Sequence, residues 1–168
     1  MKKDERNSSL EEIHCALSLH GGVVVSDDRY VQLIVRTLHQ IPKRTRNTIL
    51  AKVHFMMVGE DTHGYPVEYS IRPSTKEIKM RFIVLNFCAM KKEKDSEIMT
   101  TIAHEIAHCV LGDYNGALQH TQRSEQKADD LAEKWGFGRA YKDYQAFSMN
   151  GKPIRAKAGK RKRPTSPR

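Results

Sequence analysis

The sequence SEIMTTIAHEIAHCVLG, at residues 96–112, decides how the rest of the chain is interpreted. It contains an H-E-x-x-H pattern, in which His104 and His108 are four positions apart and Glu105 follows the first of them. Side chains at positions i and i+4 lie on one face of an α-helix, so both imidazoles can point at one metal ion. Glu105 lies about 100° further round such a helix, within reach of a water on that ion.

The same stretch has the features of a mostly buried helix. Ser96 can cap its start, and Gly112 can end it in a left-handed conformation. Most of the other side chains are apolar, whereas a polar stripe consists of Glu97, Thr101, His104, Glu105 and His108. We therefore expect a buried helix that carries this polar stripe into an interior cleft.

A metal site on this helix needs a third protein ligand, because catalytic zinc sites use three and leave a fourth position for water. The candidates that follow the motif are Asp113, His120, Glu125, Asp129 and Asp130. We favour Glu125, because it opens the next expected helix and that helix can fold back antiparallel across the first. Asp129, one turn later, could then accept a hydrogen bond from the free ring nitrogen of a zinc-bound histidine.

Caps, turns and apolar periodicity predict the elements around this centre. The expected helices are one after the capping box of Ser9 and Glu12, one from about 26 to 41, and others over 44–52, 124–135 and 139–147. The expected strands are 53–58, 67–71 and 78–87, with the last two paired as a hairpin and their aromatic side chains in the core. A sheet edge beside the metal-bearing helix would suit an extended peptide, which can add to the edge as another strand.

Length and composition indicate one domain over residues 1–150. The chain has 168 residues, of which 39% are hydrophobic and 29% charged. It contains neither an apolar run of about 20 residues nor a signal-peptide core, so we expect an intracellular, cytoplasmic protein without a membrane segment. The odd number of cysteines, Cys15, Cys88 and Cys109, indicates reduced thiols that pack as small buried side chains.

Residues 151–168 differ from the rest of the chain in charge. They contain eight of the 29 Lys and Arg residues and no acid, so residues 1–150 carry 21 basic and 20 acidic side chains. A segment of this composition is typical of a disordered, solvated tail. Its basic residues, from position 152 to 168, could also contact nucleic acid without reading its sequence, or the KRKRP at 160–164 could direct a protein to the nucleus.

A family resemblance rests on two motifs, HEIAH at 104–108 and E-x-x-A-D at 125–129, together with IVLN at 83–86 and SEQKADDLAEKWGF at 124–137. Through them, about residues 50–137 resemble the gluzincin metallopeptidases and are similar to small ImmA/IrrE-like and minimal-gluzincin proteins. The resemblance implies an α+β, zincin-like fold with N-terminal helices, a sheet of about three to four strands, the motif helix and a third-ligand helix. It also implies Zn²⁺ held by His104, His108 and Glu125, with Asp129 in support.

The implied activity is hydrolysis of peptide bonds in a protein substrate, with Glu105 as the general base. His120 and Tyr114, in the loop after the motif, are candidates for stabilising the oxyanion. One alternative is a DNA-associated SprT-like metalloprotease, whose third ligand is a histidine, a role that His120 would fill. Another is a non-catalytic module that binds zinc and uses its basic tail to bind nucleic acid.

Overall fold

The computed structural model describes residues 9–19, 23–24, 27–58, 64–71, 78–114 and 121–140. The predicted tail, the domain boundary at residue 150 and His120 lie outside these residues. The elements follow the order α1 (Leu10–Leu19), β1 (Val23–Val24), α2 (Asp28–Gln40), α3 (Lys43–Lys52), β2 (Val53–Val58), β3 (Gly64–Ile71), β4 (Ile78–Asn86), α4 (Phe87–Met90), α5 (Asp95–Leu111) and α6 (Gln122–Lys134). The expected α+β class is confirmed. Among the described helices, none combines the length and apolar character that crossing a membrane requires.

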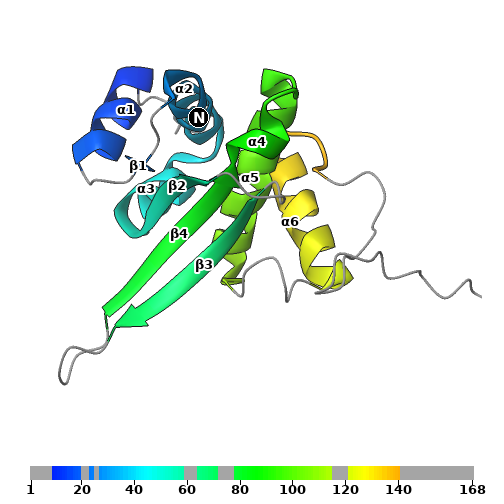
Figure 1. The fold of residues 1–168 in the computed structure, drawn as a ribbon. Helices are drawn as coiled ribbons and strands as arrows, with labels where there is room; N and C mark the ends of the chain where they lie inside the picture. The colour runs from blue at the N-terminus through cyan, green and yellow to red at the C-terminus, as the bar shows by residue number, and fades with distance from the viewer. Residues whose placement is uncertain are drawn as a thin grey trace, which may run out of the picture.

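The strands form one sheet in the order β1-β2-β4-β3 (Figure 1). β2 pairs with both β1 and β4 in parallel, and β3 pairs antiparallel with β4 from Gly64 opposite Leu85 to Ile71 opposite Ile78. The predicted hairpin is therefore confirmed, although β3 begins three residues earlier than expected. β3 is an edge strand, and its first residue lies at the same end of the sheet as the last residues of β4.

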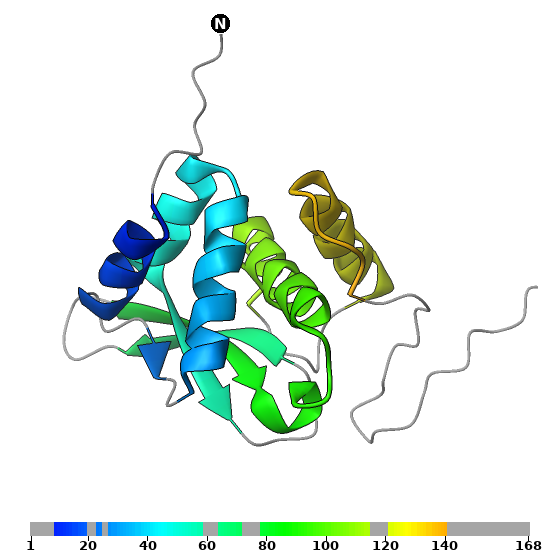
Figure 2. The same ribbon diagram turned by 90° about the horizontal axis from the view of Figure 1, so that it is seen from above.

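The helices α1, α2, α5 and α6 lie on one side of the sheet (Figure 2). α5 packs on β3 and β4, with α2 on one flank and α6 on the other, and α1 packs beside α2. The core between these layers combines fully buried side chains of the sheet with those of the helices, including Phe55, Ile83, Leu85, Leu38, Ile102 and Ile106. α5 is thus covered on several sides, as expected for a buried helix.

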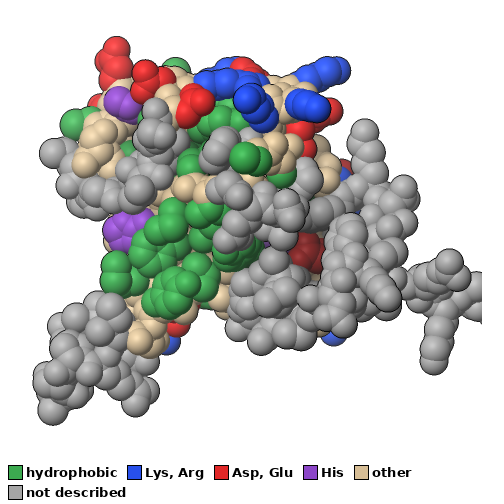
Figure 3. Space-filling model, in the orientation of Figure 1, with side chains coloured by type: hydrophobic (Ala, Val, Ile, Leu, Met, Phe, Trp, Pro, Cys, Tyr) green, Lys and Arg blue, Asp and Glu red, His purple; other side chains and the backbone are tan. Residues whose placement is uncertain are grey.

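The other face of the sheet carries the alternate side chains of β2, β3 and β4, and no helix of the described chain covers it. Phe82 stands between His54 and Tyr69, with ring centroids 5.4 and 6.0 Å away. Figure 3 shows hydrophobic side chains gathered over this region. Tyr69 is 59% exposed and Met80 is 36% exposed, so the expectation that the strand aromatics lie in the core is wrong for Tyr69.

The cap of α1 follows the predicted sequence signal, whereas α6 begins at Gln122 after the cap Thr121, two residues before its expected start. Ser9 and Glu12 form the expected capping box of α1. The N–H of Ser9 donates to the Glu12 carboxylate at 3.1 Å, and the N–H of Glu12 donates to the Ser9 hydroxyl at 3.2 Å. α5, however, begins at Asp95 after Lys94, whose N–H donates to Glu97 at 2.9 Å, so Ser96 lies inside the first turn and is not the cap. The capping glutamate three residues after Lys94 sets the start of the helix.

Three further expectations need correction. The final strand ends at Asn86, and α4 follows it, because the Asn86 side chain accepts the N–H groups of Cys88 and Ala89. All three cysteines are free thiols as expected, but only Cys109 is buried, whereas Cys15 and Cys88 are exposed. The helix expected over 139–147 is not present at Arg139 and the residue after it, and its remainder lies outside the described residues.

Candidate metal centre

The H-E-x-x-H residues lie in the most buried part of α5. Residues 101–109 are all buried, and His104, Glu105 and His108 are 1%, 2% and 0% exposed. Gly112 ends the helix with φ of 77°, the left-handed conformation that the sequence predicts. From Thr101 to His108 the polar stripe of α5 is therefore enclosed by the protein, where a charged group needs a partner, whereas Glu97 is exposed.

α6 supplies the partners of this stripe. Thr121 caps α6 by accepting the N–H of Ser124 at 3.2 Å, and the helix packs along α5 through Ala128 and Ala132, both fully buried. These small side chains allow the two helices to approach closely. Glu125 and Asp129, one turn apart on the same face of α6, are thereby brought to the histidines of α5.

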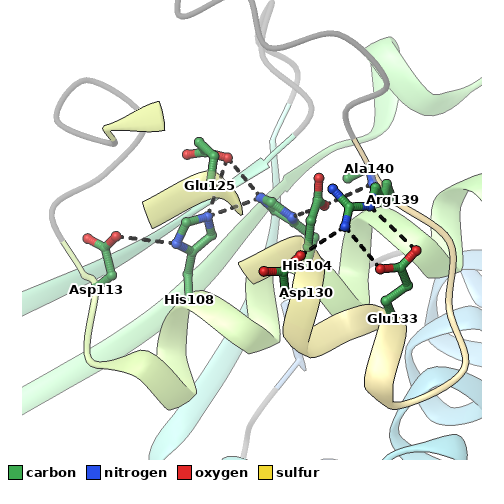
Figure 4. Close-up of polar contacts among 9 residues, drawn as sticks. His104, His108, Asp113, Glu125, Asp130, Glu133, Arg139 and Ala140 are labelled. Carbon is green, nitrogen blue, oxygen red and sulfur yellow. Dashed lines mark hydrogen bonds and ion pairs between the residues drawn. The ribbon is translucent and has the colours of Figure 1, made fainter. Parts of the chain in front are cut away.

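Three potential ligand atoms converge between the helices (Figure 4). The Nε2 atoms of His104 and His108 are 3.0 Å apart, and Oε2 of Glu125 lies 3.0 Å from the first and 3.5 Å from the second. Ligands about 2.05 Å from a tetrahedral zinc ion are about 3.3 Å from each other. The three atoms that the sequence predicts as ligands therefore have the mutual spacing of one zinc coordination sphere.

The outer nitrogen of each histidine faces a carboxylate. Nδ1 of His104 lies 2.8 Å from Oδ1 of Asp129, and Nδ1 of His108 lies 3.3 Å from Oδ2 of Asp113. A proton on Nδ1 of His104 that is shared with Asp129 leaves the lone pair of its Nε2 directed at the common point, whereas the 3.3 Å contact of His108 with Asp113 is an ion-pair distance without hydrogen-bond geometry. Asp129 also accepts the backbone N–H of Ala140 at 3.0 Å, which holds its carboxylate from a second side.

The electrostatics of this cluster favour a cation. Burial lowers the pKa of His104, but its hydrogen bonds with Asp129 and Glu125 outweigh that effect and raise the pKa from 6.5 to about 10. The carboxylates thus stabilise positive charge at the place where the ligand atoms meet. Two imidazole nitrogens and one carboxylate oxygen are also a donor set that catalytic zinc uses, so the residues present fit this metal.

Glu105 lies beside the edge strand of the sheet. A Cβ atom at Gly64 would be 3.3 Å from Cγ of Glu105 and 3.0 Å from the carbonyl oxygen of Val84. Both contacts are tight, so the absence of a side chain at Gly64 leaves room for Glu105. The first residue of β3 and the glutamate of the motif are therefore direct neighbours.

Two other sequence candidates, Asp130 and Tyr114, have their contacts away from the three ligand atoms. Asp130 is exposed and forms an ion pair of 2.9 Å with Arg139. The hydroxyl of Tyr114 donates to the carbonyl oxygen of Cys109 at 2.8 Å, and no contact places it at the ligand cluster, so its oxyanion role stays a prediction without support. His120 is outside the described residues. Sequence reasoning considered Asp113 only as a ligand and missed its contact with His108.

Comparison of the chain with known protein families, with curated proteins and with solved structures finds no match in any of the three.

Proposed function

We propose that this chain is a zinc-dependent metallopeptidase with a zincin-like fold. The observation that carries the proposal is the convergence of two Nε2 atoms and one carboxylate oxygen at 3.0–3.5 Å, with a carboxylate behind each histidine. Zinc bound to these atoms would lower the pKa of a water towards about 7 and polarise a substrate carbonyl.

Glu105 would act as the general base in this reaction. It is adjacent in sequence to the ligand His104 and is almost fully buried, where a carboxylate can exchange a proton without competition from bulk water. We infer that Glu105 takes a proton from the attacking water and passes it to the leaving amine. His104, His108 and Glu125 would hold the metal, while Asp129 and Asp113 orient the imidazoles.

The substrate we propose is an extended segment of a protein. β3 has an open edge among the described strands, and an incoming peptide can pair with such an edge through its backbone. Because Gly64, at the start of this edge, is next to Glu105, a peptide that extends along β3 would reach the general base. An intracellular location and contact of residues 152–168 with nucleic acid remain predictions.

The Glu105→Gln variant tests the mechanism. It should bind zinc as the wild type does, because Glu105 is not among the proposed ligands, but should lose proteolysis by roughly 100-fold or more. Protein N-termini that appear only when the wild-type chain is expressed would be identified by proteomics. Glu97→Gln, in the exposed first turn of the same helix, is the matched control and should retain the cleavage.

Two outcomes would contradict this mechanism. If Glu105→Gln produces the same N-termini as the wild type, Glu105 is not the base. If the wild type binds zinc but produces no new N-termini under any condition, the non-catalytic zinc module is the better description. Zinc content, measured by mass spectrometry on purified protein, accompanies each assay.

A second comparison separates the proposed ligand set from the SprT-like alternative. Glu125→Ala should release zinc, because it removes one of the three converging atoms, whereas His120→Ala should retain it. The opposite pattern would assign the third ligand to His120. The geometry favours Glu125, whose Oε2 is 3.0 Å from the Nε2 of His104.

A further inference from the structure

A cavity with both apolar and cationic side chains in its wall lies at the C-terminal end of α5. It has a volume of about 370 Å³, is partly open to solvent, and is lined by α3, the first residue of β2, Arg81 of β4 and the end of α5 with the turn that follows. None of the proposed metal ligands lines it, although Cys109, the residue after His108, forms part of its wall. The cavity is therefore a separate site that shares one helix with the metal centre.

Arg81 is held in a fixed orientation at this cavity. Its Nε donates to Oε2 of Glu68 at 2.8 Å, and its guanidinium carbon lies 4.8 Å from the centre of the Tyr114 ring. Tyr114 is itself held by the hydrogen bond that it donates to Cys109. Neither Nη nitrogen of Arg81 has a hydrogen-bond partner among the described residues, so these two nitrogens remain available to a ligand.

α3 provides the other polar groups of the cavity. Arg44, Thr48 and Lys52 are four residues apart and share one face of the helix, with Thr45 beside them. Arg44 and Lys52 are exposed, and neither forms an ion pair within the described part of the chain. The sequence of α3, KRTRNTILAK, contains no acid, and no Asp or Glu lines the cavity.

The last carbonyl groups of α5, which would disfavour a nearby anion, are partly capped. The carbonyl oxygen of Cys109 accepts both the Gly112 N–H at 3.2 Å and the Tyr114 hydroxyl, and that of His108 accepts the Asp113 N–H at 3.0 Å. These caps reduce the negative character of the helix end. The cavity thus combines three cationic side chains, of which Arg81 is paired with Glu68, with three hydroxyl-bearing side chains, and no carboxylate lines it.

We propose that this cavity binds a phosphate group, which the two Nη groups of Arg81 would hold together with the side chains of Arg44 and Lys52. An arginine whose orientation is fixed suits the bidentate binding of phosphate, and two further cations balance its second charge. The phosphate could belong to a small phosphorylated ligand or to the backbone of a nucleic acid. This proposal does not depend on the proposed peptidase activity.

Two charge-matched double variants of the full chain test it. Arg44→Ala with Lys52→Ala removes two cations from the cavity, whereas Lys91→Ala with Lys92→Ala removes two exposed cations after α4. Binding of inorganic pyrophosphate is measured by calorimetry, and that of a short single-stranded oligonucleotide by fluorescence anisotropy. The cavity variant should bind pyrophosphate about tenfold more weakly than the control variant, because charged hydrogen bonds are lost.

The oligonucleotide identifies the source of the phosphate. If its affinity falls in parallel with that of pyrophosphate, and its salt dependence decreases by about two counterions, the ligand is a nucleic-acid backbone. If only pyrophosphate binding falls, the ligand is a small phosphate compound. Any contribution of the basic residues at 152–168 is common to both double variants and cancels in the comparison.

Arg81→Lys tests the two Nη groups separately, because it keeps the charge but removes the planar pair of donors. It should weaken pyrophosphate binding relative to the wild type while thermal unfolding confirms that the chain is folded. The proposal is overturned if pyrophosphate does not bind the wild-type chain, or if the two double variants bind it with equal affinity.

Discussion

The two histidines of α5 are backed by carboxylates that the fold holds in different ways. Asp129 is 0% exposed, lies 2.8 Å from Nδ1 of His104 and also accepts the N–H of Ala140. The side chain of Asp113 is 17% exposed and lies 3.3 Å from Nδ1 of His108. Asp129 thus contacts its histidine from the buried face of a helix, whereas Asp113 contacts its histidine from a partly buried turn.

The origin of each carboxylate explains the difference. Asp129 is on α6, one turn from Glu125, so one rigid helix supplies both a proposed ligand and the group that orients another. Asp113 follows Gly112, and its position depends on the left-handed conformation that reverses the chain at the end of α5. Water can replace a partly exposed carboxylate but not a fully buried one, so the two aspartates should differ in importance.

Asp129→Ala should have the largest effect on the metal centre. It leaves the Nδ1–H of His104 and the N–H of Ala140 without their buried acceptor, and the loss of a group that orients a metal-bound imidazole weakens metal binding by up to about 100-fold. The measurement is the zinc dissociation constant by competition with a chelator of known affinity. Asp129→Asn, which keeps an acceptor oxygen at the same place, should recover most of the loss.

Asp113→Ala should have a smaller effect, about tenfold in the same zinc dissociation constant. The contact that it removes is longer and partly open to solvent, so water can take the place of the carboxylate at His108. Asp28→Ala, an exposed acid in the first turn of α2, serves as the control and should leave zinc binding unchanged. An effect of Asp113→Ala equal to that of Asp129→Ala would show that burial does not distinguish the two supports.

The sequence predicts the part of the site that depends on helical spacing. A period of 3.6 residues places His104 with His108, and Glu125 with Asp129, whatever the rest of the chain does. It does not predict that Asp113 contacts His108, because this depends on how the turn after Gly112 directs a side chain. The contact of Ala140 with Asp129 uses a backbone N–H, which every residue except proline has, so no residue type signals it.

The same distinction applies to the fold. The hairpin of β3 and β4 was predictable, because a short connection joins its strands and both show strand patterns. The parallel pairing of β2 with β4 joins residues from distant parts of the chain, such as Val53 and Arg81, and no local signal specifies it. Tyr69 was misplaced for a related reason, because alternation along a strand does not reveal which face the helices cover.

Ala140→Pro should have the smallest effect of the three and tests whether the segment after α6 supports the metal centre. Proline removes the N–H that holds Asp129 without changing charge, and it also fixes φ at this position; the loss of one net hydrogen bond should weaken zinc binding by about threefold. Ala140→Gly retains the N–H and should bind zinc as the wild type does. If both variants weaken zinc binding equally, the effect arises from the backbone conformation of this segment. If neither does, His104 alone orients Asp129, and the advantage of Asp129 over Asp113 comes from burial rather than from its second hydrogen bond.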